Sequence, residues 1–210
     1  MINIYIANIK NLYGSPQVVD NIVLNLSTYR KEKYLALKSE EMKLQSIAAA
    51  YLIDEHLKTL NLREKDMDYV ISKAGKPYFK NHRDIYFSIS HSKNIVGVAF
   101  SDKEVGLDIQ VVRDINENIF DRVLSKSEIS EVFKGNEEND LSKPNLEKFF
   151  EYWVIKEAIL KREATGLRDD IADIKNDYGV VRKFKEDNDT YFICVNNKID
   201  SNYVIKLVIL

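Results

Sequence analysis

The chain has 210 residues, 45% of them hydrophobic, and its 31 basic and 33 acidic side chains leave a formal net charge of −2. This balance excludes the broad basic surface of most nucleic-acid-binding proteins, although a small anion needs only a local basic cluster. The single cysteine, Cys194, excludes an intrachain disulfide and a cysteine metal site, and its apolar neighbours predict a core position.

The N-terminal residues predict a strand, because Ile2, Ile4 and Ile6 alternate with polar or small residues. They lack the basic region and the cleavage site of a signal peptide. The chain also contains no apolar run of about 18 residues that could span a membrane. We therefore expect a soluble, cytoplasmic protein.

Helical and strand patterns alternate along the rest of the chain. Helical pieces are expected over residues 16–37, and a longer helix should begin after Ser39 and run to about residue 60. Strand patterns follow at 68–72, 85–90, 95–101 and 105–112. The second half repeats this order, with a helix over 146–165 closed by Gly166, and strands at 179–184, 190–195 and 202–210.

This repeated order predicts an α+β protein with two similar halves, residues 1–104 and 105–210. Each half would be a long helix packed on a small antiparallel sheet. The echo suggests a pseudo-dimer, in which a pseudo-twofold axis relates the halves and a ligand cleft lies between them.

Two charged residues of the second long helix fall on its apolar face. At about 100° per residue, Glu157 and Lys161 lie within the arc formed by the apolar side chains. One interpretation is a solvated i,i+4 pair whose lysine stem covers apolar surface. The other is a cleft wall, with Glu157 at a metal ion and Lys161 at a phosphate.

Asp108 interrupts the apolar strand pattern VGLDIQ. Asp is unfavourable in strands, so either the strand ends there or the carboxylate has a partner. Asp108 and Gln110 are two residues apart and project to the same face of a strand. With Glu157 they could form an all-oxygen site, which suits Mg²⁺.

Further polar residues are candidates for anion binding. Ser90, His91 and Ser92 offer donors to phosphate oxygens where a strand ends, although His91 is equally interpretable as a loop histidine without a role. Lys76, in the turn GKPY, is placed to reach a ligand. The cluster Arg30, Lys31 and Lys33 is either a solvated helix face or an anion grip.

Glu128 also has two interpretations. Ser125 and Glu128 have the S-x-x-E spacing of a capping box, which by itself accounts for the glutamate. The competing interpretation makes Glu128 a general base at the mouth of the cleft.

The order of these motifs resembles a known family. GKP, FSISHS, VGLDIQ, SKSE, WVIKEAILK and GL follow one another over residues 75–167, with a weaker echo in RKEK. Together they resemble the 4′-phosphopantetheinyl transferases, specifically the larger, surfactin-synthetase-activating type linked to secondary metabolism. Members of this family move the phosphopantetheine arm of coenzyme A to a serine of an acyl or peptidyl carrier protein, and they release 3′,5′-ADP.

The resemblance implies a role for each candidate residue. Asp108 and Glu157 would hold Mg²⁺, with Gln110 close by or contacting a metal-bound water. Glu128 would take the proton of the carrier serine, and Lys161 would neutralise the pyrophosphate. The coenzyme A contacts would come from Lys31, Lys33, Ser46, Lys76, Ser90, His91 and Lys161.

The chain departs from the family pattern at several positions. Many relatives have an acid in place of Gln110, a glycine in place of Lys93 and an arginine in place of Gln45. We expect a monomer whose carrier protein docks near residues 113–134, with Arg113, Phe120, Arg122 and Lys126 on the docking surface. The alternative is a degenerate, non-catalytic module that binds coenzyme A or a carrier protein.

Overall fold

The structure is a computed structural model that describes residues 1–134, 143–166, 171–175, 177, 179–198 and 202–210. Its helices are α1 (Pro16–Leu24), α2 (Thr28–Ala36), α3 (Glu40–Lys58), α4 (Phe120–Val123), α5 (Lys126–Lys134) and α6 (Leu146–Glu163). Its strands are β1 (Ile2–Asn8), β2 (Tyr69–Ile71), β3 (Pro77–Phe79), β4 (Tyr86–Ser92), β5 (Ile95–Ser101), β6 (Gly106–Val111), β7 (Gly179–Glu186), β8 (Asp189–Asn196) and β9 (Tyr203–Val208).

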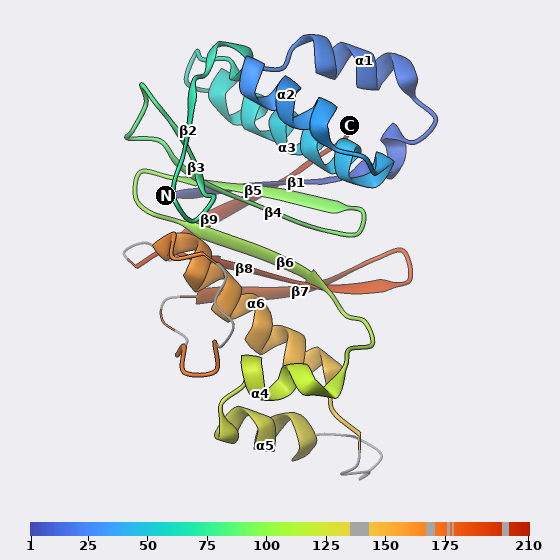
Figure 1. Cartoon of the computed structure of the whole chain (residues 1–210), viewed down its shortest axis with the longest axis vertical. Coiled ribbons are helices and arrows are strands. Elements are labelled where there is room, and N and C mark those ends of the chain that lie inside the picture. Colours follow the sequence, from blue (N-terminus) through green and yellow to red (C-terminus); the bar gives the residue numbers. More distant parts are fainter. Residues whose placement is uncertain (135–142, 167–170, 176, 178, 199–201) are drawn as a thin grey trace.

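The first sheet has the strand order β4-β5-β1-β9 and carries the long helix α3 on one face (Figure 1). Ser39 caps α3 by accepting a hydrogen bond from the amide of Met42, and Glu40 and Glu41 occupy the first turn, where the helix dipole favours acids. Tyr5, Val98 and Phe100 point from the sheet into the core beneath this helix. The predicted first strand and first long helix are confirmed.

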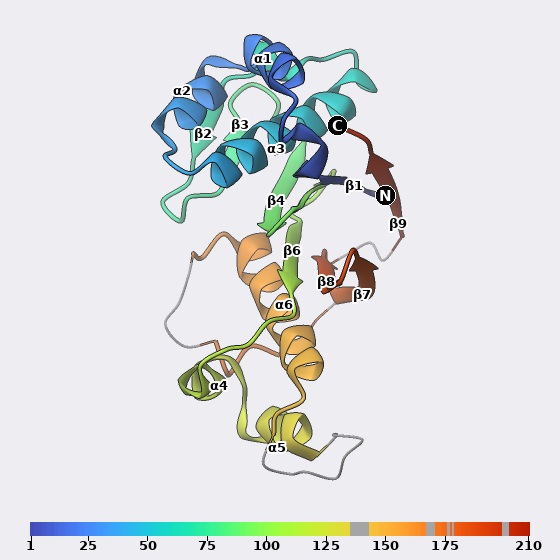
Figure 2. The same cartoon turned by 90° about the vertical axis from the view of Figure 1, so that its right-hand side faces the viewer.

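The second sheet has the order β6-β8-β7 and carries α6 on its outer face (Figure 2). The strands β6 and β8 are buried on both faces, and alternate residues serve two different cores. Phe192 and Cys194 face α6, whereas Tyr191, Ile193 and Val195 face the first sheet. The expected core position of Cys194 is confirmed.

The core between the two sheets is formed by aliphatic side chains from both of them. Ile2, Ile4 and Ile6 of β1 meet Leu107 and Ile109 of β6. The described residues therefore stack as helix α3, first sheet, second sheet and helix α6, and the protein is an α+β protein with helices packed on small sheets.

A ladder of serine hydroxyls joins the facing edges of the two sheets. The hydroxyl oxygens of Ser88, Ser90 and Ser92 on β4 accept hydrogen bonds of 3.0 Å from the amides of Leu107, Ile109 and Val111 on β6, respectively. Because serines two residues apart lie on the same face of a strand, their hydroxyls meet alternate amides of β6. We call Ser88, Ser90 and Ser92 the serine ladder. It fixes β6 in register with β4.

The structure corrects three expectations. The strand β9 pairs in parallel with β1 and completes the first sheet, so the meander expected within residues 105–210 is wrong. Residues 77–79 form β3, paired with β2, where we expected only a turn. The helix α6 ends at Glu163 and is capped by Ala164 in the left-handed conformation; Gly166 also has a positive φ, +80°, but lies two residues beyond this cap. In the part of the chain that the structure describes, no helix has the length and apolarity needed to cross a bilayer.

Candidate functional site

A pocket of about 300 Å³ lies between the β2–β3 turn, strand β4 and the C-terminal half of α6. Gly75 and Lys76 contribute one wall, Ser88 and Ile89 a second, and Glu157, Leu160 and Lys161 a third. Gly75 has φ +84° in the turn that opens this pocket, as expected for the glycine of GKPY. Gly166 also lines the pocket, which thus gathers four of the sequence motifs.

Gly106 lets β6 lie directly against the backbone of α6. A Cβ atom at this position would stand 1.8 Å from the carbonyl oxygen of Ala158 and 2.6 Å from the amide nitrogen of Arg162. Gly106, Asp108 and Gln110 share one face of β6, so the close approach at Gly106 also brings Asp108 to α6. This explains why the motif has glycine two residues before the aspartate.

Asp108 is buried and each of its carboxylate oxygens has a donor. Its Oδ1 accepts hydrogen bonds from Lys161 Nζ at 2.6 Å and from Ser90 Oγ at 2.9 Å. Its Oδ2 accepts one from the Gln110 side-chain amide at 2.9 Å. The strand β6 continues through this residue to Val111, so Asp108 does not mark a strand end. Its acidic side chain is accommodated in the strand by partners.

Glu157 lines the pocket and lies close enough to Asp108 for their charges to interact. Burial raises the pKa of Glu157, the negative charge of Asp108 raises it further, and Lys161 lowers it. Among the described ion pairs none joins Glu157 to Lys161, since Lys161 pairs with Asp108 instead. The sequence interpretation of a simple i,i+4 pair is therefore wrong, because the ammonium group is bound to Asp108 and affects Glu157 through its charge.

This donor set fits a hard divalent cation. A buried carboxylate beside a second carboxylate, as Glu157 is beside Asp108, is stabilised by a positive ion, and oxygen is the ligand that Mg²⁺ prefers. Gln110 directs its NH₂ group at Asp108, and rotating the amide would present its oxygen instead. The described residues contain no group of three or more His, Cys, Asp or Glu side chains arranged for a metal. A site here would rest on Asp108 and Glu157, with Gln110 adjacent.

Two residues of the motif Ser90-His91-Ser92, the serines, have a structural role. The hydroxyl of Ser90 belongs to the serine ladder and also contacts Lys161 Nζ at 2.9 Å. His91 is exposed on the opposite face of β4. Desolvation by the surrounding protein lowers the pKa of His91, and the positive charges of Lys161 and Lys33 lower it further. Lys161 and Lys33 thus create a positive field around His91 that suits an anion.

Lys76 lines the pocket but its ammonium group is already bound. It donates to Glu104 Oε2 at 2.6 Å and to the carbonyl oxygens of Val105 and Arg162 at 3.1 and 3.3 Å. Burial lowers the pKa of Lys76, and Glu104 opposes this shift. Lys76 thus ties the β2–β3 turn to the start of β6 and to the end of α6. Its predicted contact with coenzyme A stays a prediction.

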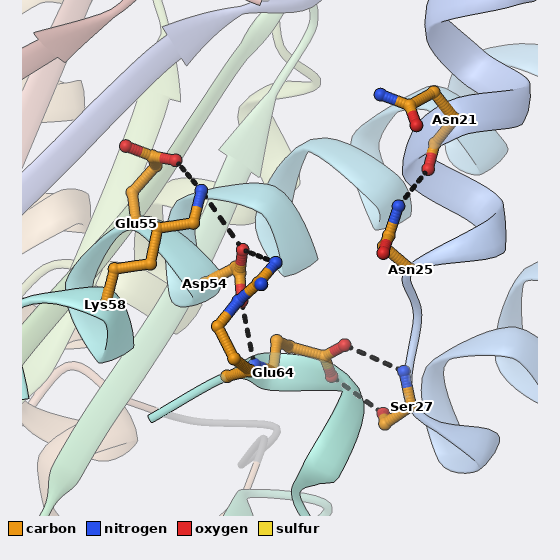
Figure 3. Close-up of polar contacts among 8 residues, drawn as sticks. Asn21, Asn25, Ser27, Asp54, Glu55, Lys58 and Glu64 are labelled. Carbon is orange, nitrogen blue, oxygen red and sulfur yellow. Dashed lines mark hydrogen bonds and ion pairs between the residues drawn. The ribbon is translucent and has the colours of Figure 1, made fainter. Parts of the chain in front are cut away.

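The basic residues predicted to bind phosphate lie on α2, and a polar network holds the start of this helix. Ser27, the N-cap of α2, donates from its amide and its hydroxyl to Glu64 at 2.8 and 2.7 Å (Figure 3). Glu64 in turn donates its backbone amide to Asp54 of α3 at 2.9 Å. Lys33 is exposed and Lys31 is half-buried on the anchored helix.

Arg30 differs from its two basic neighbours on α2. The residue is 2% exposed, its guanidinium lies 5.1 Å from the ring centroid of Tyr69, and Nε and Nη2 have no hydrogen-bond partner among the described residues. Of the three residues, Arg30 is buried and Lys33 is exposed. Ser46, also predicted as a ligand contact, is half-buried on α3.

Glu128 lies away from the pocket and forms the expected capping box. Its Oε2 accepts from the amide of Ser125 at 2.7 Å, and its own amide donates to Ser125 Oγ. The same oxygen pairs at 2.7 Å with Lys156, which is 1% exposed and also donates to the carbonyl oxygens of Val123 and Ala172. Lys156 therefore fastens α6 to the end of α4 and the start of α5.

The predicted docking segment 113–134 contains one correction. Phe120 is buried in the core against α6 and is not available to a partner. Its ring packs edge-on against Phe149 with centroids 5.0 Å apart. Arg113, Arg122 and Lys126 are exposed, as expected.

Sequence reasoning missed three residues of the site and its support. Ser88 lines the pocket and belongs to the serine ladder, and the period-two spacing of Ser88, Ser90 and Ser92 was the available signal. Gly106 was visible only as part of a motif. Lys156 stands directly before Glu157 on a helix turn, so the two side chains necessarily leave α6 in different directions.

Comparison with known proteins agrees with these motifs. A family model described as the 4′-phosphopantetheinyl transferase superfamily matches residues 104–208. The chain is 26% identical over 156 residues to the 4′-phosphopantetheinyl transferase ffp of Bacillus subtilis, covering 73% of this chain and 66% of that protein. It is 30% identical over 106 residues to the 4′-phosphopantetheinyl transferase Sfp of Bacillus subtilis strain 168, covering 50% and 45%.

A third relative is the 4′-phosphopantetheinyl transferase gsp of Aneurinibacillus migulanus, 26% identical over 144 residues, which cover 68% of this chain and 58% of that protein. The chain thus spans roughly half to two thirds of the length of these relatives. The family model covers half of the chain and includes the strand with Asp108 and the helix with Glu157 and Lys161. The chain therefore belongs to the 4′-phosphopantetheinyl transferase superfamily.

Proposed function

We propose that this protein transfers the 4′-phosphopantetheine arm of coenzyme A to a serine of an acyl or peptidyl carrier protein, in a Mg²⁺-dependent reaction that releases 3′,5′-ADP. The observation that carries this proposal is the convergence of Asp108 with Glu157 and Lys161, of which the last two line one pocket. They come from a strand and a helix about 50 residues apart in sequence, and Gly106 allows the backbones of these two elements to lie in contact.

In the proposed reaction the serine oxygen of the carrier attacks the phosphorus that bears pantetheine. A new oxygen–phosphorus bond forms, the pyrophosphate bond breaks, and 3′,5′-ADP leaves. Lys161 would neutralise the negative charge that develops on the leaving group, and His91 and Lys33 would support it. Asp108 and Glu157 would hold Mg²⁺, which when bound supplies further charge neutralisation at the pyrophosphate.

The proposal includes an arrangement of the whole fold. Residues 1–104 and 105–210 would form the halves of a pseudo-dimer, and coenzyme A would bind in the cleft between them. The pocket supports this proposal, because its walls come from both segments: Gly75, Lys76 and Ser88 precede residue 104, whereas Glu157 and Lys161 follow it. The 3′-phosphate would lie near Lys31 and Lys33, with Ser46, Lys76 and Ser90 as further contacts.

The carrier protein would dock at the exposed basic residues Arg113, Arg122 and Lys126. Carrier domains are commonly acidic helical bundles, and basic side chains around α4 and α5 offer a complementary charge. The protein would act as a monomer, because the three walls of the pocket come from a single chain.

Glu128 is the proposed base for the carrier serine, and Glu128→Gln tests this role. The amide oxygen can still accept from Ser125 and Lys156, but it cannot take a proton. We expect the transfer rate to fall by about 10²-fold or more. We also expect a loss of stability of about 1–3 kcal/mol, because buried Lys156 loses its counterion. Transfer rates and urea denaturation curves of the purified variant give both values.

Ser125→Ala is the matched control for Glu128→Gln, because it removes the cap of α5 and leaves the carboxylate. It should lower stability by about 1 kcal/mol and leave the transfer rate unchanged. If Glu128→Gln transfers at the wild-type rate at a temperature where both proteins are folded, Glu128 serves only in the capping box and the ion pair.

The proposed function is tested by the intact mass of an apo carrier protein incubated with this protein, coenzyme A and Mg²⁺. A mass gain of one phosphopantetheine arm is the expected result. Several carriers from fatty-acid, polyketide and peptide synthesis should be offered, since docking depends on the carrier surface. Coenzyme A binding without any mass gain would instead support the non-catalytic binding module.

A further inference from the structure

Asp108 carries its countercharge within the protein. Its side chain is 3% exposed, and the ammonium group of Lys161 lies 2.6 Å from Oδ1. Ser90 and Gln110 supply neutral donors to the two oxygens. An unpaired carboxylate at this depth would be strongly unfavourable, and Lys161 supplies the opposite charge in the ligand-free protein.

A divalent cation cannot simply be added to this arrangement. It would have to approach a carboxylate whose Oδ1 already holds an ammonium group, and the two positive charges would repel each other at short range. Glu157 alone would bind the cation much more weakly than Glu157 and Asp108 together. Binding of a metal at Asp108 Oδ1 therefore requires Lys161 to leave, and the ammonium group then loses its ion pair.

The ammonium group of Lys161 gains a new negative partner when the pocket holds an anion. Its side chain is 33% exposed and lines the pocket, so the flexible stem can swing toward a ligand without disturbing α6. Without a ligand, Lys33 contributes positive potential near His91, and the other carboxylate at the pocket, Glu157, would itself be a ligand of the cation. A phosphate group would provide the missing negative charge for Lys161.

We propose that Lys161 is an internal counterion that makes divalent-cation binding at Asp108 conditional on a phosphorylated ligand. In the empty protein Lys161 neutralises Asp108 and excludes the cation. When the ligand arrives, Lys161 moves to its phosphates and frees Asp108 Oδ1 for the metal. This inference rests on the proposed function and adds an order of binding to it.

The exchange implies a reciprocal coupling between metal and ligand. Whatever factor the ligand adds to the affinity for the cation, the cation adds to the affinity for the ligand. The coupling should be at least about fivefold in the wild-type protein and should approach one when Lys161 is replaced by a neutral side chain.

The test is Mn²⁺ binding to the full chain without nucleotide, followed by electron paramagnetic resonance of the free ion. We expect weak binding to the wild type and binding at least about tenfold tighter to Lys161→Met. Asp108→Ala should abolish the gain in the double variant, which places the ion at Asp108. Lys183→Met is the matched control, because Lys183 forms an ion pair of 2.5 Å with Glu147 on the surface, and it should bind Mn²⁺ like the wild type.

Adenosine 3′,5′-bisphosphate is the probe for the coupling, since its monophosphate groups chelate Mn²⁺ weakly in solution. It should tighten Mn²⁺ binding to the wild type but not to Lys161→Met. Should Lys161→Met misfold, Lys161→Gln offers a smaller change. Equal Mn²⁺ affinities of the wild type and the folded neutral variants would overturn the inference.

The two experiments distinguish a failure of the proposed function from a failure of this inference. A wild-type protein that modifies carriers while Lys161→Met binds Mn²⁺ no tighter leaves the function intact and removes the counterion exchange. If the protein modifies no carrier but Lys161→Met still binds Mn²⁺ more tightly at Asp108, the counterion exchange is supported and the transfer function is rejected.

Discussion

Asp108→Asn is expected to lower the transfer rate by about 10³-fold while the protein stays folded. The substitution removes the charge but keeps the shape of the side chain. The oxygen of the amide can still accept from Lys161 and Ser90, and its NH₂ group can donate to Gln110 once the Gln110 amide rotates. Lys161 is partly exposed and tolerates the loss of its partner. The fold is therefore retained, and the metal loses a carboxylate.

The measurement is the rate of mass gain of an apo carrier protein, with thermal denaturation of the same sample as the stability check. Asp187→Asn is the matched control, because it makes the same chemical change in a surface ion pair with Lys10. It should transfer at the wild-type rate. An active Asp108→Asn variant would remove Asp108 from the proposed metal site.

Gly106→Ala is expected to cost about 4 kcal/mol or more of folding free energy. The added Cβ would lie 1.8 Å from the carbonyl oxygen of Ala158, which is backbone of a long helix and cannot rotate away. Either α6 shifts from β6 or the two elements separate. A shift would also carry Glu157 and Lys161 away from Asp108, so any folded fraction should transfer poorly.

Gly14→Ala is the control for the glycine substitution, since Gly14 has φ +75° but no described atom within 4 Å of the place that an added methyl group would occupy. Its cost should be only the backbone strain, about 1–2 kcal/mol. Urea denaturation of both variants measures the difference. Similar stabilities for the two would show that β6 and α6 do not need to be in direct backbone contact.

The sequence alone predicted which side chains of the candidate site share a face. The two-residue period of a strand placed Asp108 and Gln110 on one face, and the helical period placed Glu157 and Lys161 on another, before any contact was known. The structure brings Asp108 and Gln110 within 2.9 Å of each other and Asp108 and Lys161 within 2.6 Å. Local periodicity fixes which side chains share a face, and the motif order indicated which faces meet.

Local patterns could not predict the long-range pairing. The strand β9 has the same alternation as a strand of the second sheet, yet it pairs with β1, about 200 residues away. Phe120 stands among exposed basic residues in sequence, but the short helix α4 turns it into the core. The burial of Lys156 depends on two carbonyl groups, from Val123 and Ala172, that no spacing rule identifies.

The serine ladder also has a consequence for association between molecules. The strand β6 is the outer strand of the second sheet, and its amides at Leu107, Ile109 and Val111 would otherwise form an open template for a strand of another chain. The hydroxyls of Ser88, Ser90 and Ser92 already occupy these amides. Aggregation by strand addition is therefore blocked at this edge by side chains, without a further strand and without the charged or proline residues that commonly protect such edges.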